Sequence, residues 1–245
     1  MGCYYTKASL YKEINRLRNF VGVDRSDYPI NLINMCKVRG NILVEAVPFN
    51  TPGLKGMASI ASQKGENDII LLNSYQSKEE RNFICGHELI HLALHRHEKI
   101  KSFNCFEKVL PNQDGFLEWQ ANEGSAEFIV PYQLLFPKLK KSLPALKTSS
   151  DFRQFRRDVA NSFNVTDAVI KFRLDDLKYE IQQYLNGTSI NNLRFLSNNQ
   201  RAAKGINVKS LSDVEDELFR AEYHIYFGDR SLFRHSKIKS RPTLF

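Results

Sequence analysis

The chain has 245 residues, of which 42% are hydrophobic and 25% charged, the composition of an ordinary globular protein. It is long enough for one large or two small domains with a sizeable core. No run approaches the ~20 consecutive apolar residues of a membrane span, and the N-terminus has no secretory hydrophobic region, so we expect a cytoplasmic protein without membrane contact. The four cysteines show no paired spacing, which fits a reduced compartment.

The first third of the chain reads as short helices followed by strands. Helical periodicity predicts two helices, and β-branched and aliphatic runs between turn residues predict three strands. The expected helices cover residues 10–20 and 29–39, and the expected strands cover residues 42–48, 55–62 and 68–73.

The strongest pattern lies in residues 81–97, RNFICGHELIHLALHRH, whose apolar residues recur at the spacing of a buried helix. His87 and His91 are four residues apart, so on a helix they would present two imidazoles to one zinc ion. Glu88 points partly off this histidine stripe. It is therefore a poor ligand but is well placed to act as the general base.

Two places could supply a third ligand. His97 stands where the longer pattern HExxHxxGxxH has its last histidine, but Leu94 replaces the glycine that this pattern needs. On a continuous helix His97 would lie ~15 Å along the axis from His87. We therefore expect His95 and His97 to form a solvated helix end.

The better candidate lies in residues 116–131, FLEWQANEGSAEFIVP. Glu118 shares a helical face with small residues that would let two helices approach closely, and it would complete a His, His, Glu site. Asn122, one turn later, could hydrogen-bond a ligating histidine. We expect Glu123 and Glu127 to face solvent, since neither shares that face.

With these motifs the chain resembles the ImmA/IrrE-like metallo-endopeptidases of phages, integrative elements and radiation-resistant bacteria. The resemblance rests on IILLN, on RNFICGHELIHLAL and on EWQANEGSAEFIVP, which is similar to the family's E-x-E-A-N-x-x-A-A-E-L-L-x-P segment. The first glutamate of that segment binds zinc in the family and corresponds to Glu118, whereas the second is Gln120 here. The resemblance implies an α/β (α+β) zincin-like domain with a small mixed or antiparallel sheet.

The resemblance also implies how cofactor and substrate bind. One zinc ion is expected, for which other divalent metals could substitute in vitro. The strand before the zinc helix would border the active-site cleft. A substrate peptide would then pair with Ile69, Ile70 and Leu71 through backbone hydrogen bonds.

Two prolines and a polar run near residues 143–151 predict a domain boundary. We expect a metallopeptidase domain over residues 1–142, a helical region over 143–185 and an extension of unknown role over 186–245. The run DVANSFNVTDAVIKFRLDDL in the helical region resembles a helix-turn-helix. Its basic and acidic residues balance, which favours packing or repressor docking over DNA binding.

Together these features predict a zinc-dependent endopeptidase in which His87, His91 and Glu118 hold the metal and Glu88 transfers the proton. Tyr75 or Tyr132 could assist the oxyanion, although no motif supports either. The resemblance implies that the substrate is a helix-turn-helix repressor of a phage or mobile element. Two alternatives stay open: an anti-repressor that sequesters the repressor without cutting it, and a DNA-binding regulator with structural zinc.

Overall fold

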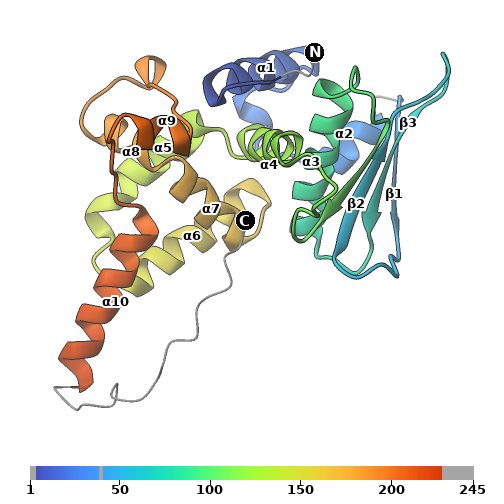
Figure 1. Cartoon of the computed structure of the whole chain (residues 1–245). Coiled ribbons are helices and arrows are strands. Elements are labelled where there is room, and N and C mark those ends of the chain that lie inside the picture. The colour runs from blue at the N-terminus through green and yellow to red at the C-terminus, as the bar shows by residue number, and fades with distance from the viewer. Residues whose placement is uncertain (1–3, 39–40, 228–245) are drawn as a thin grey trace.

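The fold places one small sheet beside a larger group of helices (Figure 1). The computed structural model describes residues 4–38 and 41–227. The strand order is β1-β3-β2-β4, with β1 and β3 parallel and the other neighbours antiparallel. The predicted α+β class with a small mixed sheet is confirmed. The strands are β1 (Ile42–Val47), β2 (Leu54–Ser59), β3 (Asp68–Asn73) and β4 (Ser102–Phe106).

Alternation along the strands decides which face of the sheet meets the helices. In β3, Ile70 and Leu72 are buried, whereas Ile69 is 37% exposed. Helices α2 (Leu32–Val38) and α3 (Lys78–Leu94) pack on the strands. Because successive side chains of a strand point to opposite faces, one face of the sheet joins the core and the other meets solvent.

Small residues let α3 pack closely against α4 (Gly115–Ile129). A side chain at Gly86 would overlap Ser125, and one at Gly124 would press on α3. The Ser125 hydroxyl donates a 2.9 Å hydrogen bond to the Phe83 carbonyl oxygen. The two helices that carry the sequence motifs are therefore held close together.

Of the remaining helices, α1 packs on α4, and the others lie on the side of α4 away from the sheet (Figure 1). Asn164, in the left-handed conformation at φ 55°, ends α6, and the Thr166 hydroxyl caps α7. These two helices and their turn form the segment that resembles a helix-turn-helix. None of the described helices combines the length and the apolar run that a bilayer crossing requires. The helices are α1 (Lys7–Phe20), α5 (Tyr132–Ser142), α6 (Ser149–Phe163), α7 (Asp167–Asp176), α8 (Lys178–Leu185), α9 (Asn198–Ala203) and α10 (Leu211–Phe227).

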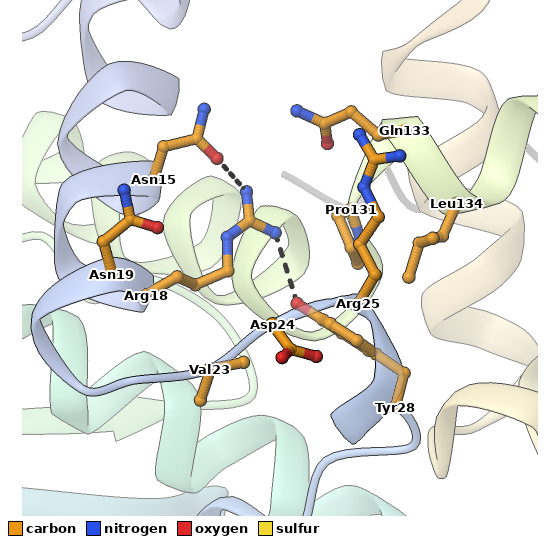
Figure 2. A pocket seen from close by; sticks show the side chains of 10 residues that line it. All are labelled: Asn15, Arg18, Asn19, Val23, Asp24, Arg25, Tyr28, Pro131, Gln133 and Leu134. Carbon is orange, nitrogen blue, oxygen red and sulfur yellow. Dashed lines mark hydrogen bonds between the residues drawn. The ribbon is translucent and has the colours of Figure 1, made fainter.

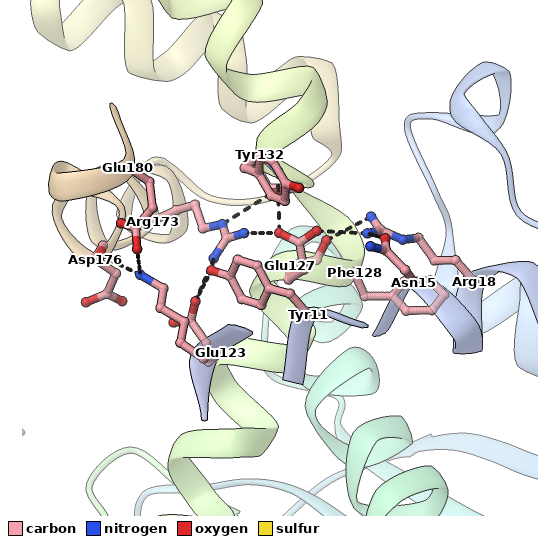
Figure 3. A network of polar contacts seen from close by, with 12 residues as sticks. Tyr11, Asn15, Arg18, Glu123, Glu127, Phe128, Tyr132, Arg173, Asp176 and Glu180 are labelled. Carbon is pink, nitrogen blue, oxygen red and sulfur yellow. Dashed lines mark hydrogen bonds and ion pairs between the residues drawn. The ribbon is translucent and has the colours of Figure 1, made fainter. Parts of the chain in front are cut away.

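A buried ionic network joins α7 and α1 to α4 (Figure 3). The Arg173 guanidinium, 1% exposed, donates to Glu123 at 2.8 Å and also pairs with Glu127. Arg18 binds the other oxygen of Glu127 at 2.8 Å. The expectation that both glutamates face solvent was wrong. Arginines from distant parts of the chain compensate their charge, which makes burial of the carboxylates tolerable.

Candidate metal centre

The candidate metal centre lies where α3 and α4 face each other. The Nε2 atoms of His87 and His91 lie 3.1 Å apart. The Glu118 carboxylate oxygens lie 3.3 Å from His87 Nε2 and 3.7 Å from His91 Nε2. All three side chains are buried, and their donor atoms lie within 4.8 Å of one another. Two imidazole nitrogens and a carboxylate oxygen at this spacing fit the protein ligand set of a catalytic zinc ion.

Hydrogen bonds orient two of these side chains. The Asn122 side-chain oxygen lies 3.0 Å from His87 Nδ1, so it can accept that proton and leave Nε2 free to face the centre. The Gln113 amide donates a 3.2 Å bond to Glu118 Oε1. The structure thus brings Asn122, expected one turn after Glu118, into contact with His87.

His95 supports the other histidine. Its Nδ1 lies 2.8 Å from His91 Nδ1, and its side chain is fully buried. The expectation of a solvated end was wrong for His95, because its backbone N–H donates to the His91 carbonyl oxygen as in a helix and its ring stays one turn after His91, on the buried side. The Phe103 ring stacks on His91 at 4.3 Å and covers the same side. His97, by contrast, is exposed.

Glu88 lies beneath β2, and no described side chain hydrogen-bonds its carboxylate oxygens. A Cβ atom at Gly56 would come within 2.8 Å of Glu88 Oε1, so only glycine leaves room there. Burial away from water raises the pKa of Glu88 to about 8, and the neighbouring Glu118 charge acts in the same direction. A cation at the centre would oppose both effects and favour the carboxylate form.

Cys105 was missed by sequence reasoning. Its sulfur, His87 and Glu88 form a second group of possible donor atoms within 4.8 Å of one another. Cys105 lies in β4, a strand that the sequence pattern did not predict. Cys105 comes close to His87 and Glu88 only because β4 pairs with β2, and the sequence did not predict that pairing.

The predicted substrate strand was assigned wrongly. Ile69, Ile70 and Leu71 lie in β3, which pairs with β1 on one side and β2 on the other. Its backbone groups are therefore already used by the sheet, and a peptide cannot add to it. The prediction failed because the order of the strands in the sheet was not visible from their order in the chain.

The positions of Tyr75 and Tyr132 do not support a role for either in stabilising the oxyanion. Tyr132 is buried, and its ring stacks on Tyr11 at 6.0 Å within the Arg173 network. Tyr75 is 76% exposed. No described contact joins either side chain to the His87, His91 and Glu118 cluster.

A separate pocket of about 270 Å³ lies between the end of α1 and the α4–α5 junction (Figure 2). Asn15, Arg18 and Tyr28 line it, and Arg18 bonds both to Asn15 and to the Tyr28 hydroxyl. It shares no lining residue with the metal centre. Since Glu127 neutralises Arg18 from behind, the pocket is polar rather than strongly cationic.

The chain is similar to one protein family and to a solved structure. Residues 41–175 match the model of peptidase family M78, the IrrE N-terminal-like domain. Among solved structures, a Mycobacterium tuberculosis transcriptional regulator is 13% identical, with a TM-score of 0.44 over 69% of this chain and 47% of the other. The chain thus spans about half the length of that protein. None of the curated proteins compared with the chain matches it. Because the family model covers more than half of the chain, this protein belongs to the IrrE N-terminal-like family of peptidases.

Proposed function

We propose that the protein is a zinc-dependent endopeptidase. The observation that carries the proposal is the convergence of His87, His91 and Glu118, with the buried Glu88 carboxyl next to His87. When bound, zinc would supply a Lewis acid and an acidified water. Glu88 would take the proton of the attacking water and pass it to the leaving amine. Gly56 keeps the space that this carboxylate occupies.

We further propose that the substrate pairs with β4 instead of β3. In the described sheet β4 has one neighbour, β2. On its other edge the Asn104 carbonyl oxygen accepts a 2.6 Å hydrogen bond from the Gln113 side chain, which a paired peptide would have to displace. Phe103 and Cys105 are buried in β4, and both lie at the metal centre: Phe103 stacks on His91, and Cys105 lies beside His87. An extended peptide on this edge would be held by backbone hydrogen bonds beside the site.

The proposed substrate is a helix-turn-helix repressor of a phage or mobile element, as the family resemblance implies. Residues 143–185 would then serve as the docking region, and residues 186–245 as an extension of it. Phe172 on α7 is 60% exposed and could contact such a partner, whereas Arg173 is buried in the ionic network. Because Arg173 is buried, it cannot contact DNA, which weakens the proposal that α7 is a DNA-recognition helix.

Sequestration without cleavage is the second candidate function, and it would use the same docking surface. The same exposed Phe172 would bind a repressor whether or not the repressor is cut. Cleavage and sequestration differ in whether Glu88 is required.

The test incubates the purified chain with zinc and the repressor encoded beside it, and looks for fragments by mass spectrometry. We expect the wild-type protein to give fragments and Glu88→Gln to give none while keeping its zinc. Glu79→Gln, on the first turn of the same helix, is the matched control and should cleave normally. A stable complex without fragments would favour sequestration, and cleavage by Glu88→Gln would end the proposed mechanism.

A further inference from the structure

The edge of the sheet farthest from β4 is open. In the described sheet β1 pairs with β3 alone. The Asn41 carbonyl oxygen accepts a 3.2 Å hydrogen bond from Asp68 in β3, and that of Val47 accepts a 2.9 Å bond from Ser74, the residue after β3. Since backbone groups alternate in direction along a strand, the N–H and C=O groups of Val44 and Ala46 point away from β3, toward the open edge.

A groove of about 360 Å³ runs along this edge, between β1, α2 and the first turns of α3. Val44, Glu45 and Ala46 line it, so the groove lies against the strand whose outer backbone groups have no partner in the described sheet. Ile33 and Leu72 contribute apolar side chains to the wall of the groove. The groove therefore combines free backbone donors and acceptors with apolar surface, which is what an added strand requires.

The side chains around the groove are mostly cationic. Lys37, Lys78 and Arg81 line it, and Glu45 is the one acidic residue among its described lining. None of the three cations forms an ion pair with a described residue. The Arg81 Nε atom is buried without a described hydrogen-bond partner. An Arg N–H buried without a partner costs free energy, which an incoming acceptor would recover.

We propose that this groove binds an extended, acidic segment of a partner protein, which adds to β1 as a further strand. The β1 backbone would pair with the segment, and Lys37, Lys78 and Arg81 would receive its carboxylates. None of the groove's lining residues belongs to the metal centre, so the site acts at a distance from the chemistry. This proposal goes beyond the proposed peptidase function, because binding here needs neither zinc nor cleavage.

The shape of the groove favours a peptide over nucleic acid. Its walls include Val44, Ala46 and Leu72, which suit apolar side chains that alternate with acidic ones. A nucleic acid would also leave the outward-facing N–H and C=O groups of β1 without their natural strand partner.

The test measures fluorescence anisotropy of a short labelled peptide that alternates glutamate and valine, added to the full chain. We expect binding, and a loss of about tenfold in affinity for the double variant Lys37→Gln, Arg81→Gln. Lys12→Gln, an exposed cation on α1 outside the groove, is the matched control and should bind as the wild type does.

Strand addition is tested separately. Ala46→Pro removes an N–H that points to the open edge, so it should weaken the peptide while the sheet survives. Methylating alternate backbone nitrogens of the peptide should do the same without altering the protein. The proposal is overturned if the peptide does not bind, if a lysine and valine peptide binds as tightly, if the double variant binds unchanged, or if a single-stranded oligonucleotide displaces the peptide.

Discussion

The Nδ1 atoms of His91 and His95 lie 2.8 Å apart, and both rings are fully buried at the end of α3. An ion held at His91 Nε2 requires the His91 proton to sit on Nδ1, where it would donate to His95. His95 would therefore fix the ring of the proposed metal ligand His91. It would do so with a neutral imidazole, in the position where many metal sites use a carboxylate or a carbonyl oxygen.

We expect His95→Phe to weaken zinc binding by about 10-fold to 100-fold, because it keeps the ring but removes the hydrogen bond. Competition with a chromophoric chelator measures the change in Kd. His97→Phe, exposed two residues later, should leave the Kd unaltered. Equal zinc affinity for the wild type and His95→Phe would show that His95 does not orient His91 for metal binding.

Gly56→Ala should disturb Glu88 directly. The added Cβ would lie 2.8 Å from Glu88 Oε1 and would overlap Ile84, so we expect a loss of about 1–3 kcal/mol in the free energy of unfolding and a fall in kcat. Urea unfolding and a peptide-cleavage assay measure the two effects. Gly115→Ala is the control, since a Cβ there meets nothing within 4 Å. Unchanged stability and activity in Gly56→Ala would show that the carboxyl lies elsewhere.

Glu88 should make the metal-free protein less stable as the pH rises. Its pKa is raised by burial from 4.5 when unfolded to about 8 when folded, so between these values the folded state holds a proton that the unfolded state has lost. Over that window the wild type should lose up to ~1.4 kcal/mol per pH unit relative to Glu88→Gln. Urea unfolding of chelator-treated protein at several pH values measures the difference. A constant difference between the two proteins would contradict the assignment.

Removal of Arg173 should be costly. Arg173→Met would leave Glu123 and the Arg173-facing oxygen of Glu127 without their buried cation, and we expect a loss of about 3–5 kcal/mol in the free energy of unfolding. Lys171→Met, on an exposed part of the same helix, should change stability by less than about 0.5 kcal/mol. Thermal and urea unfolding give both values. Similar losses in the two variants would show that the network contributes little.

Local periodicity was enough to predict the centre of the site. The four-residue spacing of His87 and His91 requires only a helix, and the small residues beside Glu118 indicated a closely packed second helix. Both helices appear in the structure, and Asn122 lies against His87 as its position suggested. These features depend on spacing within a helix and on contacts between two helices, and a sequence pattern can indicate both.

The wrong predictions all depended on distant contacts. Glu123 and Glu127 look like surface charges until Arg173, 50 and 46 residues away, packs on them. The His95 and Phe103 rings lie 6.1 Å apart, and Phe103 belongs to a strand that gave no clear sequence pattern. The interior position of β3 follows from the order of strands in the sheet, which chain order does not specify.

Zinc stoichiometry tests the central claim most directly. Native mass spectrometry of the purified chain, reconstituted with zinc and freed of excess metal, should show one ion per chain for the wild type and none for Glu118→Ala. Glu88→Gln should keep its ion, because Glu88 serves as a base and is not a ligand. A wild-type chain without zinc, or a Glu118→Ala chain that holds zinc as firmly as the wild type, would contradict the assignment of His87, His91 and Glu118 as the metal centre.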